Sequence, residues 1–143
     1  MIVREASYND VSQLVSLMEQ LGYPTTLDKF KNRLSAIAEH PDYHTLVAEI
    51  NGKIIGMAGL CSGLFYEYDG SYVRIVAFIV DKDYRRKGIG KKLIQEAECW
   101  AKKQGAVAIA LNSGNRPERK EAHQFYTSLG YIAKSTGFSK RLV

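Results

Sequence analysis

The segment 84–93, YRRKGIGKKL, combines the densest positive charge of the chain with two glycines one residue apart. Neighbouring cations repel one another, and glycine loses much conformational entropy on folding. We therefore expect this combination only where a favourable interaction, such as binding of an anion, offsets both costs. Long basic side chains attract anions, and the unpaired N–H groups of a helix N-terminus bind phosphate. The chemistry that these residues indicate is the binding of an anion, and a pyrophosphate fits the arrangement well.

The spacing excludes two well-known phosphate-binding loops. A Walker A loop requires GxxxxGK[ST], but Lys91 is followed by Lys92, and the residue five before Gly90 is Arg85. A dinucleotide-binding fingerprint requires GxGxxG, but its third glycine position holds Leu93. Neither of these two loops fits, and the segment could still receive a nucleic acid, a nucleotide or only solvent.

The elements around this segment place it between a strand and a helix. Three antiparallel strands are expected near residues 45–50, 53–66 and 71–80. Asn51-Gly52 and Asp69-Gly70 are the dipeptides that tight hairpins prefer. After the loop, a helix is expected over residues 90–104, because Leu93, Ile94, Ala97, Trp100 and Ala101 form one apolar stripe.

Further elements are expected towards the two ends of the chain. A short strand in MIVREAS precedes a helix that has Val11, Leu14, Val15, Met18 and Leu21 on one face and ends at Gly22. A second helix starts at Thr25 or Thr26, buries Leu27, Phe30, Leu34 and Ile37, and stops before Pro41. AVAIALNS (106–113) is typical of a strand buried on both faces. A helix over 118–129, with Ala122, Phe125, Tyr126 and Leu129 on one face, precedes two closing strands, YIAKS (131–135) and FSKRLV (138–143).

This order of elements predicts one mixed α/β (α+β) domain over residues 1–143. Its centre is a mostly antiparallel, twisted sheet with one parallel β-α-β crossover, flanked by about four helices. No apolar stretch approaches the ~20 residues that span a bilayer, and MIVREASYND lacks the apolar core of a signal peptide, so we expect a cytoplasmic protein without a membrane partner. Cys61 and Cys99 lack metal-ligand spacing, so we expect free thiols and no metal.

Arg85-x-x-Gly88-x-Gly90, between a strand and an amphipathic helix, resembles the coenzyme A loop of the GNAT superfamily of acyl-CoA N-acyltransferases. The resemblance extends over FIVDKDYRRKGIGKKLIQEAECWAKKQG (78–105), which is similar to that family's central block. AHQFYTSLGY (122–131) resembles its C-terminal signature, and IVREASYNDVSQL (2–14) resembles its first strand and helix. The resemblance covers essentially the full chain, including the order of elements.

The resemblance implies an N-acetyltransferase that passes the acetyl group of acetyl-CoA directly to a primary amine, without a covalent acyl-enzyme. The pyrophosphate would lie on the backbone of residues 86–91. Pantetheine would run as an extra strand beside residues 78–80, where the sheet separates from the strand at 106–113. A backbone N–H near Phe78 would stabilise the oxyanion. The cofactor-binding residues implied are Phe78, Ile79, Val80, Arg85, Arg86, Lys87, Gly88, Ile89, Gly90 and Lys91.

Tyr126 matches the family tyrosine that protonates the leaving thiolate; from its position on an apolar stripe alone it would be a core aromatic. The strand 71–80 carries Arg74 and no interior carboxylate, which leaves the general base open between water, hairpin acids and His123. Arg119 stands where many relatives have asparagine. Arg119 and Arg116 could contact the cofactor or face solvent.

The acceptor is less defined than the donor. FYEYDGSY (65–72) is aromatic and acidic, and the family places this hairpin near the acceptor entrance, so a cationic amine is expected. Two other function classes are a non-catalytic acyl-CoA sensor and a nucleic-acid-binding module. Tyr84 is the only aromatic residue in the basic segment, which disfavours nucleic acid as a partner. The family's use of exposed strands in dimers makes a homodimer a further expectation.

Overall fold

The computed structural model describes residues 1–114 and 117–143. These residues form two compact units, 1–110 and 111–143.

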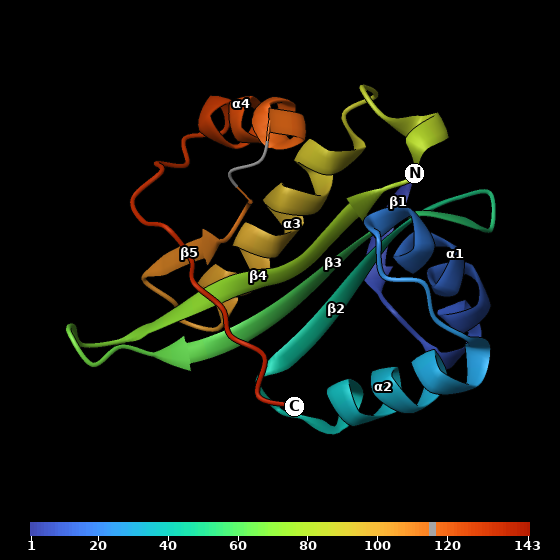
Figure 1. Cartoon of the computed structure of the whole chain (residues 1–143), viewed down its shortest axis with the longest axis horizontal. Helices are drawn as coiled ribbons and strands as arrows, with labels where there is room; N and C mark the ends of the chain where they lie inside the picture. Colours follow the sequence, from blue (N-terminus) through green and yellow to red (C-terminus); the bar gives the residue numbers. More distant parts are fainter. Residues whose placement is uncertain (115–116) are drawn as a thin grey trace. The chain divides into compact units, whose positions relative to one another are not determined.

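The first unit is built on a five-stranded sheet with the strand order β1-β2-β3-β4-β5 (Figure 1). The strands are β1 (Ile2–Glu5), β2 (Tyr43–Ile50), β3 (Lys53–Leu64), β4 (Ser71–Val80) and β5 (Ala108–Leu111). β1 to β4 pair in antiparallel fashion, each with the next. β5 follows the crossover helix and forms the parallel pair of this mixed sheet beside β4. The predicted fold class is therefore confirmed.

Helices cover both faces of this sheet. They are α1 (Val11–Leu21), α2 (Leu27–Glu39) and α3 (Ile89–Lys103). Met57 on β3 belongs to the core cluster of α1 and α2, whereas the preceding Gly56 lies against Leu93 of α3. Because successive strand residues point to opposite faces, α1 and α2 lie on one face and α3 on the other.

Several local predictions are confirmed in this unit. Asn51 and Gly52 have φ values of 48° and 82°, the left-handed pair that a tight hairpin turn requires. Thr26 caps α2, because its hydroxyl accepts a hydrogen bond from the Lys29 N–H at 3.3 Å. Along α3, the expected apolar stripe is buried apart from Trp100, which is half-buried.

Three predictions in this unit are wrong. Leu27 is exposed rather than buried, because it is the first residue of α2 and lies before the face that packs on the sheet. β3 ends at Leu64, so the connection to β4 is the loop 65–70 and not a tight turn at Asp69-Gly70. β5 alternates between exposed and half-buried residues, so it is not buried on both faces.

The second unit contains α4 (Lys120–Ser128), preceded by a 3-10 turn (Pro117–Arg119). This agrees with the helix predicted over 118–129. The closing strands predicted at 131–135 and 138–143 do not form: residues 131–143 contain neither strand nor helix. Ile132 and Phe138 are 75% and 95% exposed, and two short strands that bury so little apolar surface are not stable as a hairpin.

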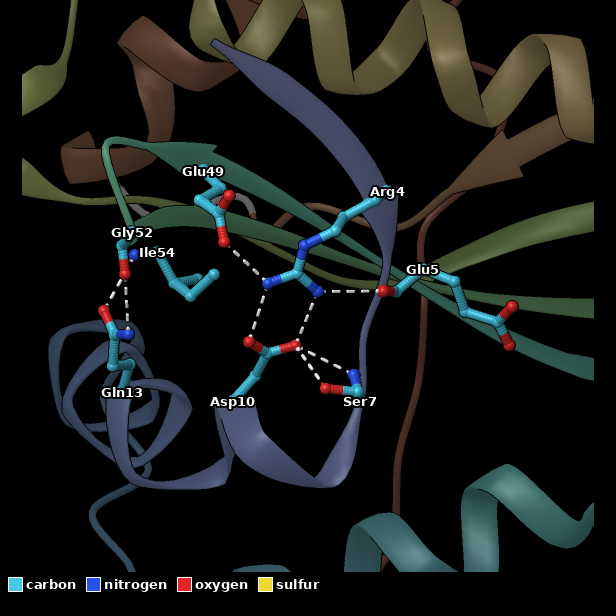
Figure 2. A network of polar contacts seen from close by, with 8 residues as sticks. All are labelled: Arg4, Glu5, Ser7, Asp10, Gln13, Glu49, Gly52 and Ile54. Carbon is cyan, nitrogen blue, oxygen red and sulfur yellow. Dashed lines mark hydrogen bonds and ion pairs between the residues drawn. The ribbon is translucent and has the colours of Figure 1, made fainter.

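A network of polar side chains fastens the N-terminal strand to its neighbours (Figure 2). The Arg4 guanidinium donates to both carboxylate oxygens of Asp10 at 2.8 Å and to Glu49 Oε1 at 2.8 Å. Asp10 also accepts a hydrogen bond from the Ser7 N–H at 2.8 Å. Asp10 is only 4% exposed, and its hydrogen bonds with Arg4 hold the pKa of its carboxyl below the usual value. The network therefore joins β1, the start of α1 and β2.

Replacing Asp10 with alanine should lower the free energy of unfolding by about 2 kcal/mol, because Arg4 keeps only one carboxylate partner, Glu49, besides the Glu5 carbonyl, and the Ser7 N–H loses its acceptor. Urea unfolding measures this change. Asp10→Asn is the matched variant: it keeps an acceptor for Ser7 and should be less destabilising. An unchanged urea midpoint in Asp10→Ala would show that the network does not stabilise the fold.

The network should also make stability depend on pH. Since Arg4 lowers the pKa of Asp10, the carboxylate contributes fully above the usual carboxyl pKa, and its contribution is lost as the pH falls through the lowered pKa. The difference in unfolding free energy between wild type and Asp10→Asn should therefore shrink below about pH 4. A difference that stays constant down to the acid transition would contradict this assignment.

Candidate functional site

The chain turns sharply where β4 ends, and Asp81 holds this turn. The Asp81 N–H donates to the Ile55 carbonyl at 2.8 Å, which continues the sheet by one bond. Its carboxylate accepts the Asp83 N–H at 2.9 Å, and its carbonyl accepts the Tyr84 N–H at 2.9 Å. Asp81 is buried, and the 3-10 turn Lys82–Tyr84 that it caps starts the basic segment from a fixed point.

Two residues of the loop that follows have left-handed backbone conformations. Arg86 has φ +63°, and Gly88, the N-cap of α3, has φ +80°. Alternation of left-handed and ordinary residues turns successive N–H groups towards one side, which makes a concave anion site. The N–H groups in the first turn of α3 also lack partners within the helix and carry the positive end of its dipole. The loop and the helix N-terminus thus present donors to an anion.

The basic side chains surround these donors. Arg85, Arg86, Lys87 and Lys91 are exposed. Arg85 Nε donates to the Val80 carbonyl at 3.2 Å, which ties this side chain to the end of β4. The Lys87 ammonium lies 5.4 Å from the ring centre of Tyr84. The positive charge therefore gathers around the helix N-terminus, where it would attract an anion over several ångströms.

A β-bulge interrupts β4 at Val76. Gly59 of β3 pairs with Ala77 and the next residue, Leu60, pairs with Ile75, so Val76 has no opposite residue. Val76 is 47% exposed. A bulge of this kind bends its strand and changes the direction of the neighbouring side chains.

β5 accompanies only the first part of β4. The Val107 N–H donates to the Ser71 carbonyl at 2.8 Å, so β5 begins level with the start of β4. β5 has four residues and β4 has ten. Because parallel strands rise by nearly the same amount per residue, β5 reaches about as far as the bulge and not to Val80.

The ten residues expected to bind the cofactor all lie on this continuous strand, loop and helix start. Phe78, Ile79 and Val80 are the last three residues of β4, and Arg85 to Gly88 lie in the loop. Ile89, Gly90 and Lys91 form the first turn of α3. The side chains of Ile79 and Ile89 are buried in the core, so these two residues can offer a ligand only their backbone groups.

Tyr126 lies on α4 in the second unit. Its ring is half-buried and makes edge contacts with Phe125 at 5.4 Å and Tyr131 at 6.4 Å between ring centres. Burial raises the pKa of Tyr126, and the positive charge of Arg119 acts in the opposite direction. Tyr126 therefore keeps its phenolic proton at neutral pH.

The remaining candidate residues from the sequence are two arginines, a histidine and two cysteines. His123 Nε2 shares a hydrogen bond with the Gly114 carbonyl at 2.8 Å. Arg119 is the N-cap of α4, and Arg116 lies outside the described residues. Cys61 and Cys99 are free thiols, as predicted. Within residues 1–114 and 117–143, no three His, Cys, Asp or Glu side chains gather as a metal site, and no helix is long and apolar enough to cross a bilayer.

Sequence reasoning missed three features of the site. The bulge at Val76 and the cap at Asp81 were not expected, nor was the hydrogen bond from the Lys82 N–H to Gln20 Oε1 at 2.9 Å, which joins the loop to α1. For the bulge, the glycines inside β3, such as Gly56 and Gly59, were the available signal in the sequence. An isolated glycine in a strand often marks a bulge or a close approach of another segment.

Comparison with known proteins identifies the family. The sequence model of the acetyltransferase (GNAT) family matches residues 10–131. The chain belongs to this family. A solved GNAT family acetyltransferase from Staphylococcus aureus is 38% identical, with a TM-score of 0.85 over 99% of this chain and 98% of its own.

Two curated GNAT relatives are somewhat more distant. An uncharacterized N-acetyltransferase of Bacillus subtilis is 29% identical over 87% of this chain and 86% of its own length. An aminoalkylphosphonate N-acetyltransferase of Salmonella typhimurium is 27% identical over 98% and 90%. The expected family, fold class and enzyme class are thus confirmed, and the acyl donor of this family is acetyl-CoA.

Replacing Gly88 with alanine should weaken acetyl-CoA binding about tenfold, because an alanine at φ +80° strains the start of α3 by about 1 kcal/mol and adds a Cβ beside the N–H donors. Isothermal titration calorimetry measures the affinity.

Gly105→Ala is the matched control. Gly105 has φ +79° and open space around it, as Gly88 has, but it lies beyond the other end of α3. Both variants should lose similar stability, and only Gly88→Ala should lose affinity. Equal affinities in the two variants would exclude the N-terminus of α3 as the site.

Proposed function

We propose that this GNAT enzyme transfers the acetyl group of acetyl-CoA directly to a primary amine. The observation that carries the proposal is the N-terminus of α3, where Arg86 and Gly88 adopt left-handed conformations amid exposed basic side chains. The family match spans residues of both units, which supports our proposal that the whole chain, 1–143, is one N-acetyltransferase domain.

In this proposal the pyrophosphate of acetyl-CoA binds the N–H groups of residues 86–91. Arg85, Lys87 and Lys91 attract its charge, and helix-terminal N–H groups favour a phosphate for both geometric and electrostatic reasons. Pantetheine then runs beside residues 78–80 as an added strand, and the short β5 supports this because it accompanies only the first part of β4.

The chemical step follows from this placement. The neutral amine nitrogen attacks the thioester carbon, and a backbone N–H near Phe78, just after the bulge, stabilises the oxyanion that develops. When the tetrahedral intermediate collapses, the C–S bond breaks and coenzyme A leaves as a thiolate. The products are an amide and, after protonation, the free thiol.

We propose Tyr126 as the acid that protonates the thiolate. Its match to the family signature supports this role, and its raised pKa means that the proton is present when the thiolate forms. Solvent then returns the proton to the phenolate. We propose that the amine loses its own proton to water, because β4 carries no carboxylate and Glu67 and Asp69 are exposed in the loop 65–70.

Tyr126→Phe should lower kcat for amine-dependent thiol release about a hundredfold, with little change in the KM for acetyl-CoA, because only the proton donor is lost. A thiol-reactive dye follows the reaction with a panel of amino acids, aminoalkylphosphonates, polyamines and aminoglycosides.

Tyr131→Phe is the matched control, since it removes a neighbouring hydroxyl from the same unit. This variant should retain the wild-type rate. A Tyr126→Phe enzyme with wild-type kcat would show that Tyr126 is a packing residue. An enzyme that neither binds acetyl-CoA nor releases thiol with any amine would overturn the proposed function itself.

A further inference from the structure

The face of the sheet that carries α1 and α2 continues beyond these helices along β3. Met57 lies in the core beneath the helices, and every second residue after it points to the same face, namely Gly59, Cys61 and Gly63. Cys61 pairs with Tyr43 on β2 and with Arg74 on β4. A row of three residues from adjacent strands therefore crosses this part of the sheet.

The bulge at Val76 is the reason that Arg74 belongs to this row. Ile79 lies on the core face of α1 and α2, and an uninterrupted strand would continue that face with residues 77, 75 and 73. The extra residue reverses the alternation, so that Ile75 and Val73 are buried with Leu60 on the other face. Arg74 is left on the face of Cys61, and it is exposed.

Small residues keep the surface beside Arg74 shallow, and aromatic rings border it. A Cβ on Gly63 would lie 2.7 Å from the Tyr72 ring, so that ring lies across the glycine. Phe65 contacts Tyr72 with 5.0 Å between ring centres. We call the surface made by Tyr43, Gly59, Cys61, Gly63, Tyr72 and Arg74 the β3 floor.

Arg74 is the positive group of the β3 floor. Among the described residues, no carboxylate forms an ion pair with its guanidinium. Its field nevertheless extends across the floor: the Cys61 thiol raises the pKa of Tyr43, and the charge of Arg74 works against that rise. An exposed arginine beside a shallow surface can direct the N–H groups of its planar guanidinium at a planar or tetrahedral oxyanion and bind it.

We propose that Arg74 binds an anionic group of the acceptor, a carboxylate or a phosphonate, and so selects amines that carry an oxyanion. This inference rests on the proposed function, because it places the reacting amine next to the bulge. The backbones of Arg74 and Phe78 are about 13 Å apart along the strand, and the long arginine side chain can span part of this distance. The acceptor is therefore a small amine whose oxyanion lies a few bonds from the nitrogen.

This inference revises the expectation of a simply cationic acceptor. Glu67 and Asp69, the carboxylates that supported that expectation together with the aromatic residues of the same segment, are exposed in the loop 65–70. Arg74 lies on β4 itself, two residues before the bulge. A polyamine would meet like charge there, whereas an amino acid or aminoalkylphosphonate would pair its oxyanion with the guanidinium and direct its amine along the strand.

The test compares acceptors that differ only in charge. Amino carboxylates and aminoalkylphosphonates of matched chain length are assayed against alkylamines and spermidine, with thiol release and calorimetry in the presence of coenzyme A. The anionic amines should be preferred in kcat/KM about tenfold or more, as a charge-assisted pair predicts. The carboxylate and phosphonate series show which oxyanion is the better ligand.

Arg74→Ala should raise the KM for the anionic amines about tenfold, with little change in kcat or in the KM for acetyl-CoA, and should leave alkylamines unaffected. Arg74→Lys should restore part of the affinity, because a point charge replaces the bidentate fork. Arg33→Ala on α2, where the guanidinium lies 5.7 Å from the Phe30 ring centre, removes the same charge elsewhere and should behave as wild type.

The outcomes separate the two proposals. Preference for spermidine or alkylamines, or an Arg74→Ala enzyme with unchanged KM for the anionic amines, overturns the inference and leaves the acetyltransferase intact. Failure of every anionic amine to react or bind, with acetyl-CoA still bound, also overturns the inference. Failure to bind acetyl-CoA at all overturns the proposed function instead.

Discussion

The close approach of α3 to the sheet at Gly56 is the constraint on which the proposed donor site depends. A Cβ at this position would lie 2.8 Å from Leu93 Cδ1 and 3.3 Å from the Ile79 carbonyl oxygen, so any larger residue would force Leu93 or the strand to shift, and glycine lets α3 lie close to β3 and β4. Leu93 and Ile89 bury their side chains in that contact, which fixes the first turn of the helix. The N–H groups of that turn consequently stand close to the end of β4, where Asp81 turns the chain.

In our proposal the bulge in β4 lets the same strand contact both the acyl donor and the acceptor amine. On one side of Val76, residues 77–80 offer a strand edge that β5 does not reach. On the other side, the reversed alternation places Arg74 on the β3 floor. In our proposal the donor approaches from the α3 end, the acceptor lies on the floor, and the two meet at the bulge. If this proposal holds, the single extra residue at Val76 positions both the donor edge and the acceptor-binding Arg74.

Much of this arrangement could be predicted because it follows from local patterns. The apolar stripe along α3 and the Asn51-Gly52 turn depend on residues close in sequence. The resemblance of 78–105 to a coenzyme A loop likewise rests on one continuous segment. By contrast, Arg4 meets Glu49 through strand pairing, and no periodicity reports a partner so far along the chain. The bulge depends on the register between β3 and β4, which the sequence does not reveal. The face on which Arg74 lies could therefore not be predicted, and the sequence showed only that this strand carries an arginine and no carboxylate.

In the C-terminal segment the sequence predicted structure that does not form. YIAKS and FSKRLV have strand-like composition, yet residues 131–143 form no strand, because β structure needs a partner strand and a buried face that composition does not supply. The same reasoning applies to β5, whose apolar run predicted burial on both faces although its residues are exposed or half-buried. Composition thus indicates the capacity for a strand, and pairing decides whether it forms and how deeply it is buried.

The most direct measurement is an amide NMR titration of the isotope-labelled protein with coenzyme A, compared with pantetheine, which lacks the pyrophosphate. Our account predicts that coenzyme A shifts the backbone amides of residues 86–91 strongly, and that pantetheine perturbs residues 78–80 while leaving the loop amides nearly unchanged. Coenzyme A that binds without shifting the amides of residues 86–91, or that shifts them no more than pantetheine does, would contradict the proposed donor site.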